Sequence, residues 1–305
     1  MAVEYKKQIT ARFKNGVFPV DFLVLIFSAL MTVVSLLFFN TLSRPFLFTV
    51  ADITIFLVLF YLIVHEKRIT DSASYWLHSW LPVISVAVFY TQATAYDHLI
   101  FKETFEPLLL QWESNLFGNF NRLADFPGNN LLVDELMHFF YFSYYLILFI
   151  PGMIMLSRRS PRAHEMIFSL TLMMVAHCIF FILFPGNGPV ENHPIIFTRG
   201  LIFIPLMNII YEIGGNQGGG AIPSTHVAVA VMVFLYSFFE FKRVHWPVLI
   251  TAAGIVFATV YCSYHYIIDT LAGLFTGIMF YFIGKRVYLN WDHPAELAAE
   301  SLSRQ

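Results

Sequence analysis

Long apolar runs constrain this 305-residue chain more than any other feature. A helix rises about 1.5 Å per residue, so about 20 apolar residues cross the ~30 Å hydrocarbon core of a bilayer. Only 12% of the residues are charged, about half the usual share in a soluble domain. The sequence therefore predicts an all-α, polytopic membrane bundle of about eight transmembrane helices. The apolar runs lie at about residues 17–40, 46–65, 76–95, 135–156, 165–184, 224–240, 247–264 and 267–286.

The basic residues indicate how the bundle is oriented. Lys and Arg precede the first run and follow the second, fourth, sixth and eighth, whereas Arg44, Lys102, Arg122 and Arg199 lie on the opposite side. Because basic residues favour the cytoplasmic side, both termini are expected to be cytoplasmic. The first run is interpreted as a retained anchor, because it is long, contains Asp21 and lacks a small-x-small cleavage site.

We expect a single membrane domain, since no internal repeat or polar linker divides the chain. Its parts are anchoring helices at 1–95, an extracytoplasmic interfacial loop at 96–133, a helical core at 134–288 and a cytoplasmic tail at 289–305. In the loop, carboxylates such as Glu106 and Glu113 mix with Leu and Trp residues. That pattern is typical of helices lying in the membrane interface, with a lid-like structural role as the alternative.

Two histidines carry the chemical signal. His226 ends the segment Ala-Ile-Pro-Ser-Thr-His, and His265 begins His-Tyr-Ile-Ile-Asp, 39 positions later. This separation corresponds to two helices and a turn, so both histidines should face the extracytoplasmic side. Asp269 follows His265 at i+4, where a helix would bring its carboxylate to one ring nitrogen. The arrangement suits a nucleophile facing a proton donor, and the alternative is a buried polar cluster that only ties helices together.

The same residues resemble signatures of the type 2 phosphatidic acid phosphatase (PAP2) superfamily. Pro-Ser-Thr-His at 223–226 is similar to the second signature, and His265 with Asp269 is similar to the third. The resemblance extends over about residues 96–288. It is closest to the branch that includes inositol phosphorylceramide synthases and many bacterial lipid phosphatases. It includes Asn115-Leu116-Phe117-Gly118, the aromatic run from Phe139 to Tyr145, and Phe184-Pro185-x-x-Gly188-Pro189.

The resemblance implies a covalent mechanism that needs no metal or cofactor. His265 would attack phosphorus and become a phosphohistidine, Asp269 would hold its other nitrogen, and His226 would transfer the proton. The substrate would be a membrane lipid phosphate. The acceptor would be water, slightly favoured, or a lipid or polyol hydroxyl.

The chain departs from the family pattern where cations usually bind the phosphate. Val190 and Glu191 follow Gly188-Pro189 in place of basic residues, and Thr259 stands where an Arg is usual. The remaining candidates for phosphate binding combine a cation, backbone N–H groups in a glycine-rich loop, and hydroxyls. They are Arg199, Gly219, Gly220, Ser224 and Thr225.

Two other functions stay open at this point. A transporter or lipid-binding protein would place ionisable residues at mid-membrane depth, and a catalytically silent relative would explain the missing cations. His138 and His177 are predicted to be structural histidines within spans. The composition gives no indication of nucleic-acid binding, and it leaves the lipid, the organelle and the oligomeric state open.

Overall fold

A computed structural model describes residues 18–65, 72–118, 127–214, 219–241 and 245–291, and within these ranges the fold is all-α. The predicted fold class is confirmed, because each predicted apolar run coincides with one helix. These helices are α2 (Pro19–Leu37), α3 (Pro45–His65), α4 (Ser72–Ala95), α6 (Leu131–Ser157), α7 (Pro161–Leu183), α10 (Thr225–Glu240), α11 (His245–Tyr261) and α12 (Ile267–Asn290).

The helix lengths support an integral membrane protein. Among the described residues, α2, α3, α6, α7 and α12 are long and apolar enough to cross a bilayer, whereas α10 and α11 are shorter apolar helices. The number of spans and the cytoplasmic termini stay predictions. α12 continues to Asn290, and residues 292–305, which make up most of the tail predicted at 289–305, lie outside the described ranges.

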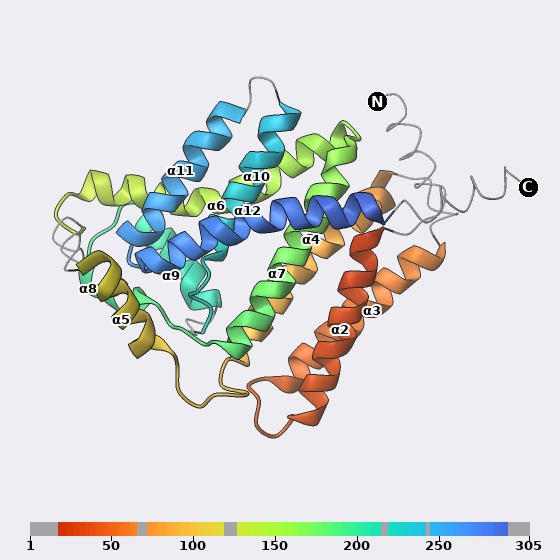
Figure 1. Ribbon diagram of the computed structural model, residues 1–305, viewed down its shortest axis with the longest axis horizontal. Helices are drawn as coiled ribbons and strands as arrows, with labels where there is room; N and C mark the ends of the chain where they lie inside the picture. The colour runs from red at the N-terminus through yellow and green to blue at the C-terminus, as the bar shows by residue number, and fades with distance from the viewer. Residues whose placement is uncertain (1–17, 66–71, 119–126, 215–218, 242–244, 292–305) are drawn as a thin grey trace, which may run out of the picture.

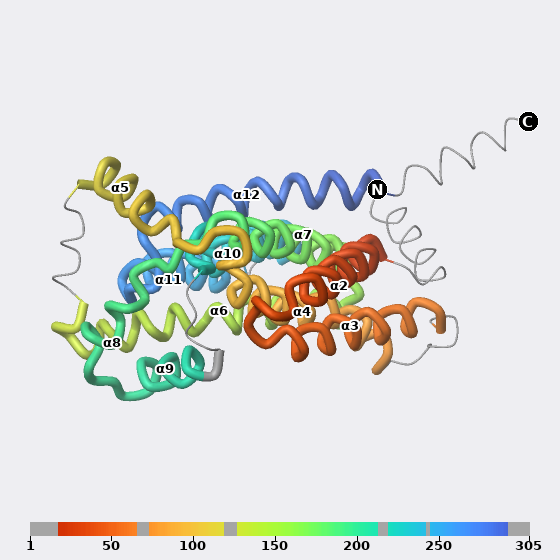
Figure 2. Tube along the Cα trace, turned by 90° about the horizontal axis from the view of Figure 1, so that it is seen from below, coloured from red at the N-terminus to blue at the C-terminus, as the bar shows by residue number. Residues whose placement is uncertain are grey.

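Short helices occupy the loop predicted at 96–133 and the loop between α7 and α10. The first loop contains α5 (Glu106–Phe117), and the second contains η3 (Pro189–Asn192), α8 (His193–Ile196) and α9 (Phe203–Gly214). Figures 1 and 2 both show α5, α8 and α9 at the same end of the bundle. The N-terminal ends of α10 and α12 lie near this end.

Close packing of α10 on α12 brings the two motifs together. A Cβ atom on Gly273 would lie 2.5 Å from the carbonyl oxygen of Ser224, and one on Gly277 would lie 2.6 Å from that of Ala228. Larger residues would push the helices apart, so these glycines allow the close approach. The approach places His226, near the start of α10, beside His265, just before α12.

The N-terminal helices are joined by buried polar contacts. Gln92 on α4 donates to Asp52 on α3 (2.9 Å) and to Ser35 on α2 (3.2 Å), and Ser35 also bonds the hydroxyl of Tyr96 (2.8 Å). Polar groups inside a membrane protein stabilise helix association when they find partners. α4 in turn packs against α7, so this cluster connects α2 and α3 to the rest of the bundle.

Candidate active site

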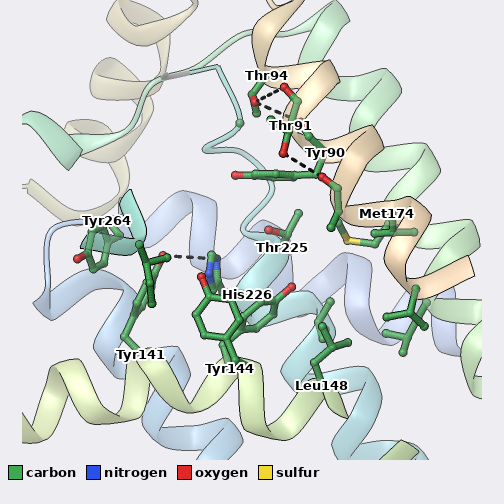
Figure 3. Close-up of a pocket in the computed structure, with 18 of the residues that line it drawn as sticks. Tyr90, Thr91, Thr94, Tyr141, Tyr144, Leu148, Met174, Thr225, His226 and Tyr264 are labelled. Carbon is green, nitrogen blue, oxygen red and sulfur yellow. Dashed lines mark hydrogen bonds between the residues drawn. The ribbon is translucent and has the colours of Figure 1, made fainter. Parts of the chain in front are cut away.

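The two motifs open into one cavity of about 480 Å³. Thr225, His226 and His265 line it, together with Asn187 and Gly220 from the loops that precede α10. Figure 3 shows Thr225 and His226 in this cavity, with side chains from α4 and α6 around them. The structure therefore brings together residues from three distant segments that the sequence singled out.

His226 is held between aromatic rings of α6. Its ring lies 4.6 Å from the ring of Tyr141 and 4.3 Å from that of Tyr144, centroid to centroid. Figure 3 shows the hydrogen bond between Tyr141 and His226. The Tyr141 hydroxyl lies 3.4 Å from Nδ1, so Nε2 remains for other partners. Ser224 is fully buried and caps α10 by accepting from the Val227 N–H, and it does not line the cavity.

His265 and Asp269 lie next to each other, although not in the helical geometry expected. Tyr266 is the N-cap of α12, so His265 precedes the helix. The distance from His265 Nδ1 to Asp269 Oδ2 is 3.7 Å, which is within ion-pair range but longer than a hydrogen bond. The same oxygen accepts the Tyr266 N–H at 2.9 Å. The ring centroids of His226 and His265 are 6.0 Å apart.

The turn between α11 and α12 fixes the backbone at His265. The carbonyl of Thr259 accepts from the N–H groups of Tyr264 (3.1 Å) and His265 (3.0 Å), and Ser263 adopts a left-handed conformation (φ 56°). The Thr259 hydroxyl bonds that of Thr270 on α12 at 3.1 Å. Thr259 therefore joins the two helices that flank His265.

Two carboxylates of α5 bind the segments around the site. Glu106 accepts from the N–H groups of Asn187 (2.9 Å) and Gly188 (3.2 Å) with one oxygen, and from the Tyr266 hydroxyl (2.7 Å) with the other. Glu113 is 2% exposed and accepts from the N–H groups of Ile267 (3.1 Å) and Ile268 (3.0 Å). An interfacial helix was predicted here, and its two carboxylates point inward, where Glu113 caps the first turn of α12.

These contacts predict different effects for two conservative substitutions. Both oxygens of Glu113 accept backbone N–H groups, so in Glu113→Gln the new NH₂ group must face a donor. We expect a loss of about 1–3 kcal/mol in stability and lower activity. Glu106→Gln is the matched control and should be tolerated, because its NH₂ group can donate to the Tyr266 hydroxyl. Thermal unfolding and turnover in detergent measure both effects, and equal behaviour of the two variants would contradict this assignment.

The proposed phosphate ligands are only partly brought together. Gly220 and Thr225 line the cavity, but Gly219 does not, and its N–H donates to Asn187 Oδ1 at 3.1 Å. Gly219 has φ 91°, and a Cβ there would collide with the carboxylate of Asp97. Arg199 is exposed in the loop between α8 and α9 and does not line the cavity. The described residues that line the cavity include no Lys or Arg.

A second layer of polar residues supports the site, and sequence reasoning missed most of it. His138 Nδ1 contacts the Asp134 carbonyl at 2.6 Å, which confirms the structural role predicted for His138. Its Nε2 lies 2.9 Å from His193 Nε2, which is 3.0 Å from the Tyr264 hydroxyl. Burial, with a smaller effect from His138, lowers the pKa of His193 to about 4, so His193 is neutral near pH 7. The contact with His193 fixes the side chain of Tyr264, the residue that precedes His265.

Comparison with known families decides the class of the site. A model described as the PAP2 superfamily matches residues 107–283, more than half of the chain. The chain belongs to the PAP2 superfamily. The PAP2 match includes α10, α12 up to residue 283 and both motifs, within the 96–288 region over which the resemblance was predicted. No curated protein and no solved structure matches the chain significantly.

Membership in the PAP2 superfamily indicates phosphatase-type activity in a membrane protein. The ionisable residues of the two motifs, two imidazoles and one carboxylate, are the groups that can supply a nucleophile, a proton donor and an orienting charge. Within the described ranges, no group of three or more His, Cys, Asp and Glu side chains is arranged to hold a metal ion.

Proposed function

We propose that this protein is a lipid phosphatase or phosphotransferase that cleaves a lipid phosphoester at the extracytoplasmic face of a membrane. The observation that carries the proposal is the pair of imidazoles, His226 and His265, with ring centroids 6.0 Å apart in one cavity. Asp269 lies beside one of them and a tyrosine hydroxyl beside the other. Two differently supported imidazoles are suited to opposite roles in proton and phosphoryl transfer.

In the first step, His265 attacks phosphorus through Nε2. Nδ1 faces the Asp269 carboxylate, which favours the tautomer with hydrogen on Nδ1 and leaves the Nε2 lone pair free. A small rotation of the imidazole would shorten the 3.7 Å contact to a hydrogen bond. A P–N bond forms as the P–O bond to the lipid alcohol breaks. His226, as an imidazolium, gives its Nε2 proton to the leaving oxygen.

In the second step, neutral His226 removes a proton from the acceptor. The acceptor oxygen attacks phosphorus, the P–N bond breaks, and His265 is regenerated. The Tyr141 hydroxyl near Nδ1 keeps the His226 ring oriented through both steps. The same base serves water and an alcohol, so the geometry of the histidines is compatible with either acceptor.

Charge on the phosphoryl group is balanced without an arginine in this proposal. The phosphate would sit at the N-terminus of α10, where the helix dipole favours an anion, and the Thr225 hydroxyl would donate to it. Gly220 allows the loop before α10 to lie close to α4, because a Cβ on Gly220 would be 2.7 Å from the Thr94 side chain. The imidazolium of His226 supplies a further positive charge during the first step.

Hydrolysis is the favoured reaction, and transfer to a lipid or polyol hydroxyl is the second candidate. Transfer is supported by Thr259, which stands where an Arg is usual and which links α11 to α12. Inositol phosphorylceramide synthases, the branch that the motifs resemble, transfer a phospho-head group to a lipid hydroxyl. The two reactions differ only in what occupies the acceptor position beside His226.

One labelling experiment separates these reactions. The purified protein is incubated with lipids labelled in the phosphate, with and without alcohol acceptors, beside a His265→Ala variant. Free labelled phosphate indicates hydrolysis, and label in a second lipid indicates transfer. If no label moves in a His265-dependent manner across a broad lipid panel, the proposal fails, and a transport or silent role is favoured.

A further inference from the structure

The cavity extends well beyond the residues that the phosphoryl chemistry uses. Its remaining walls come from α4, α6 and α7, and their lining side chains are mainly aliphatic and aromatic. No charged side chain lines this part of the cavity in the described residues. These walls include Val83, Ile84 and Ala87 of α4, Leu148 and Phe149 of α6, and Leu170 and Met174 of α7.

The depth of this apolar part matches one leaflet of a bilayer. The side chain of Thr94 on α4 lies beside Gly220, so Thr94 marks the level of the motifs on this helix. Val83 lies 11 positions earlier on α4. At about 1.5 Å per residue the two are about 16 Å apart, roughly half of the ~30 Å hydrocarbon thickness. Figure 3 shows Leu148 and Met174 on the side of the cavity away from Thr94. A chain anchored at the motifs would reach the membrane midplane.

Aromatic side chains close the far end of the cavity. The rings of Trp80 on α4 and Phe149 on α6 are in contact, with centroids 5.3 Å apart. Gly152 allows Trp80 to approach α6, because a Cβ at Gly152 would lie 3.3 Å from the indole ring. Of these two rings only Phe149 lines the cavity, and Val83 is the α4 residue lining it that lies farthest from Thr94, so the space ends near Val83.

The side of the cavity opens toward the surface between α4 and α6. Ile84 on α4 and Phe149 on α6 both line the cavity, and they are 51% and 40% exposed. Among the described helices, α4 packs closely against α7 and α6 against α11, while the backbones of α4 and α6 are not closely packed, although Trp80 reaches Gly152 and Phe149 at the far end of the cavity. A lipid in the bilayer could reach the cavity through this gap.

We propose that this apolar part of the cavity binds one hydrocarbon chain of the lipid substrate, and that α4 limits the length of that chain at Val83. The inference rests on the proposed function, because it places the phosphate at His265. The whole cavity, about 480 Å³ with the part at the motifs included, is within the ~300–1,000 Å³ range of small-molecule sites, and its apolar part suits one chain. α4 lies outside the matched residues 107–283, so this wall is supplied by a segment that the family model does not cover.

Binding is tested first, in His265→Ala protein reconstituted in lipid nanodiscs. The probe is hexadecyl phosphate with a diazirine at the end of the chain, and the cross-linked residues are identified by mass spectrometry. We expect cross-links at residues 83–87 or 170–174, competed by hexadecyl phosphate and not by inorganic phosphate. Cross-links confined to outward-facing residues such as Leu77, which is 46% exposed, would overturn the inference.

Chain-length preference is tested second, with Val83→Phe. The larger ring should shorten the space, and we expect the ratio of kcat/KM for hexadecyl over octyl phosphate to fall by about 10-fold or more. Leu77→Phe on the same helix is the matched control and should leave the ratio unchanged. An unchanged ratio in a folded Val83→Phe variant would contradict the assignment, and if that variant does not fold, the cross-linking result decides.

The two tests separate this inference from the proposed function. Cross-links in the cavity without turnover of any lipid phosphate would support chain binding and reject the enzymatic proposal. His265-dependent turnover without cross-links in the cavity would reject chain binding alone.

Discussion

Replacing His265 with alanine is expected to lower turnover of a lipid phosphate by about 10⁴-fold or more, because the covalent route loses its nucleophile. The residue is 6% exposed and its backbone is fixed by Thr259, so the substitution should remove the imidazole without unfolding the turn. Turnover by purified, folded protein in detergent or nanodiscs measures the effect.

A surface histidine provides the matched control for that substitution. His98 lies in the same extracytoplasmic loop as α5 by prediction and its side chain is 55% exposed. His98→Ala should retain the activity of the unmodified protein. Substantial activity in a folded His265→Ala variant would reject the proposed nucleophile.

Replacing His226 with alanine is expected to have the next largest effect, and its size should depend on the leaving group. Loss of a general acid typically costs about 10²–10⁴-fold for a poor leaving group such as an alkyl alcohol. An aryl phosphate with a stable phenolate needs no proton, so its first step should be affected far less. Comparing hexadecyl phosphate with an aryl phosphate therefore isolates the proton-donating role.

The control for this second prediction is Tyr141→Phe. That variant keeps the stacked ring and removes only the hydroxyl that lies 3.4 Å from His226 Nδ1, so we expect a smaller loss. If His226→Ala slowed the first step, measured as release of the leaving alcohol or phenol in a single turnover, equally for both substrates, His226 would bind the phosphate or support the fold, and it would not act as the proton donor.

Hydrophobicity alone predicted the helices well, because about 20 apolar residues have few alternatives to a spanning or buried helix. The motif spacing also predicted that His226 and His265 would meet, since two helices and a turn return the chain to the same side. The glycines that allow α12 to pack closely on α10 were not identified from the sequence. A glycine at a helix contact can be recognised only when the residue that it faces on the other helix is known. Gly273 and Gly277 have such partners only in the folded bundle.

The supporting residues were harder to predict, because their partners are distant in sequence. Glu106 and Glu113 were interpreted as members of an interfacial helix. Their carboxylate oxygens accept hydrogen bonds from N–H groups that lie about 80 positions later for Glu106 and about 150 positions later for Glu113. Arg199 was predicted to bind phosphate because it is a basic residue near the motifs on the extracytoplasmic side. It is exposed and does not line the cavity. Charge and proximity in sequence do not determine which way a loop residue points.

The most direct test of the account is to trap the covalent intermediate. The reaction with a lipid labelled in its phosphate is stopped during turnover, and the protein is examined for bound label and for the residue that carries it. We predict acid-labile, alkali-stable label on His265 that is absent from His265→Ala and persists longer in His226→Ala with an aryl phosphate. Product formation with no labelled protein, or label on a different residue, would contradict the account.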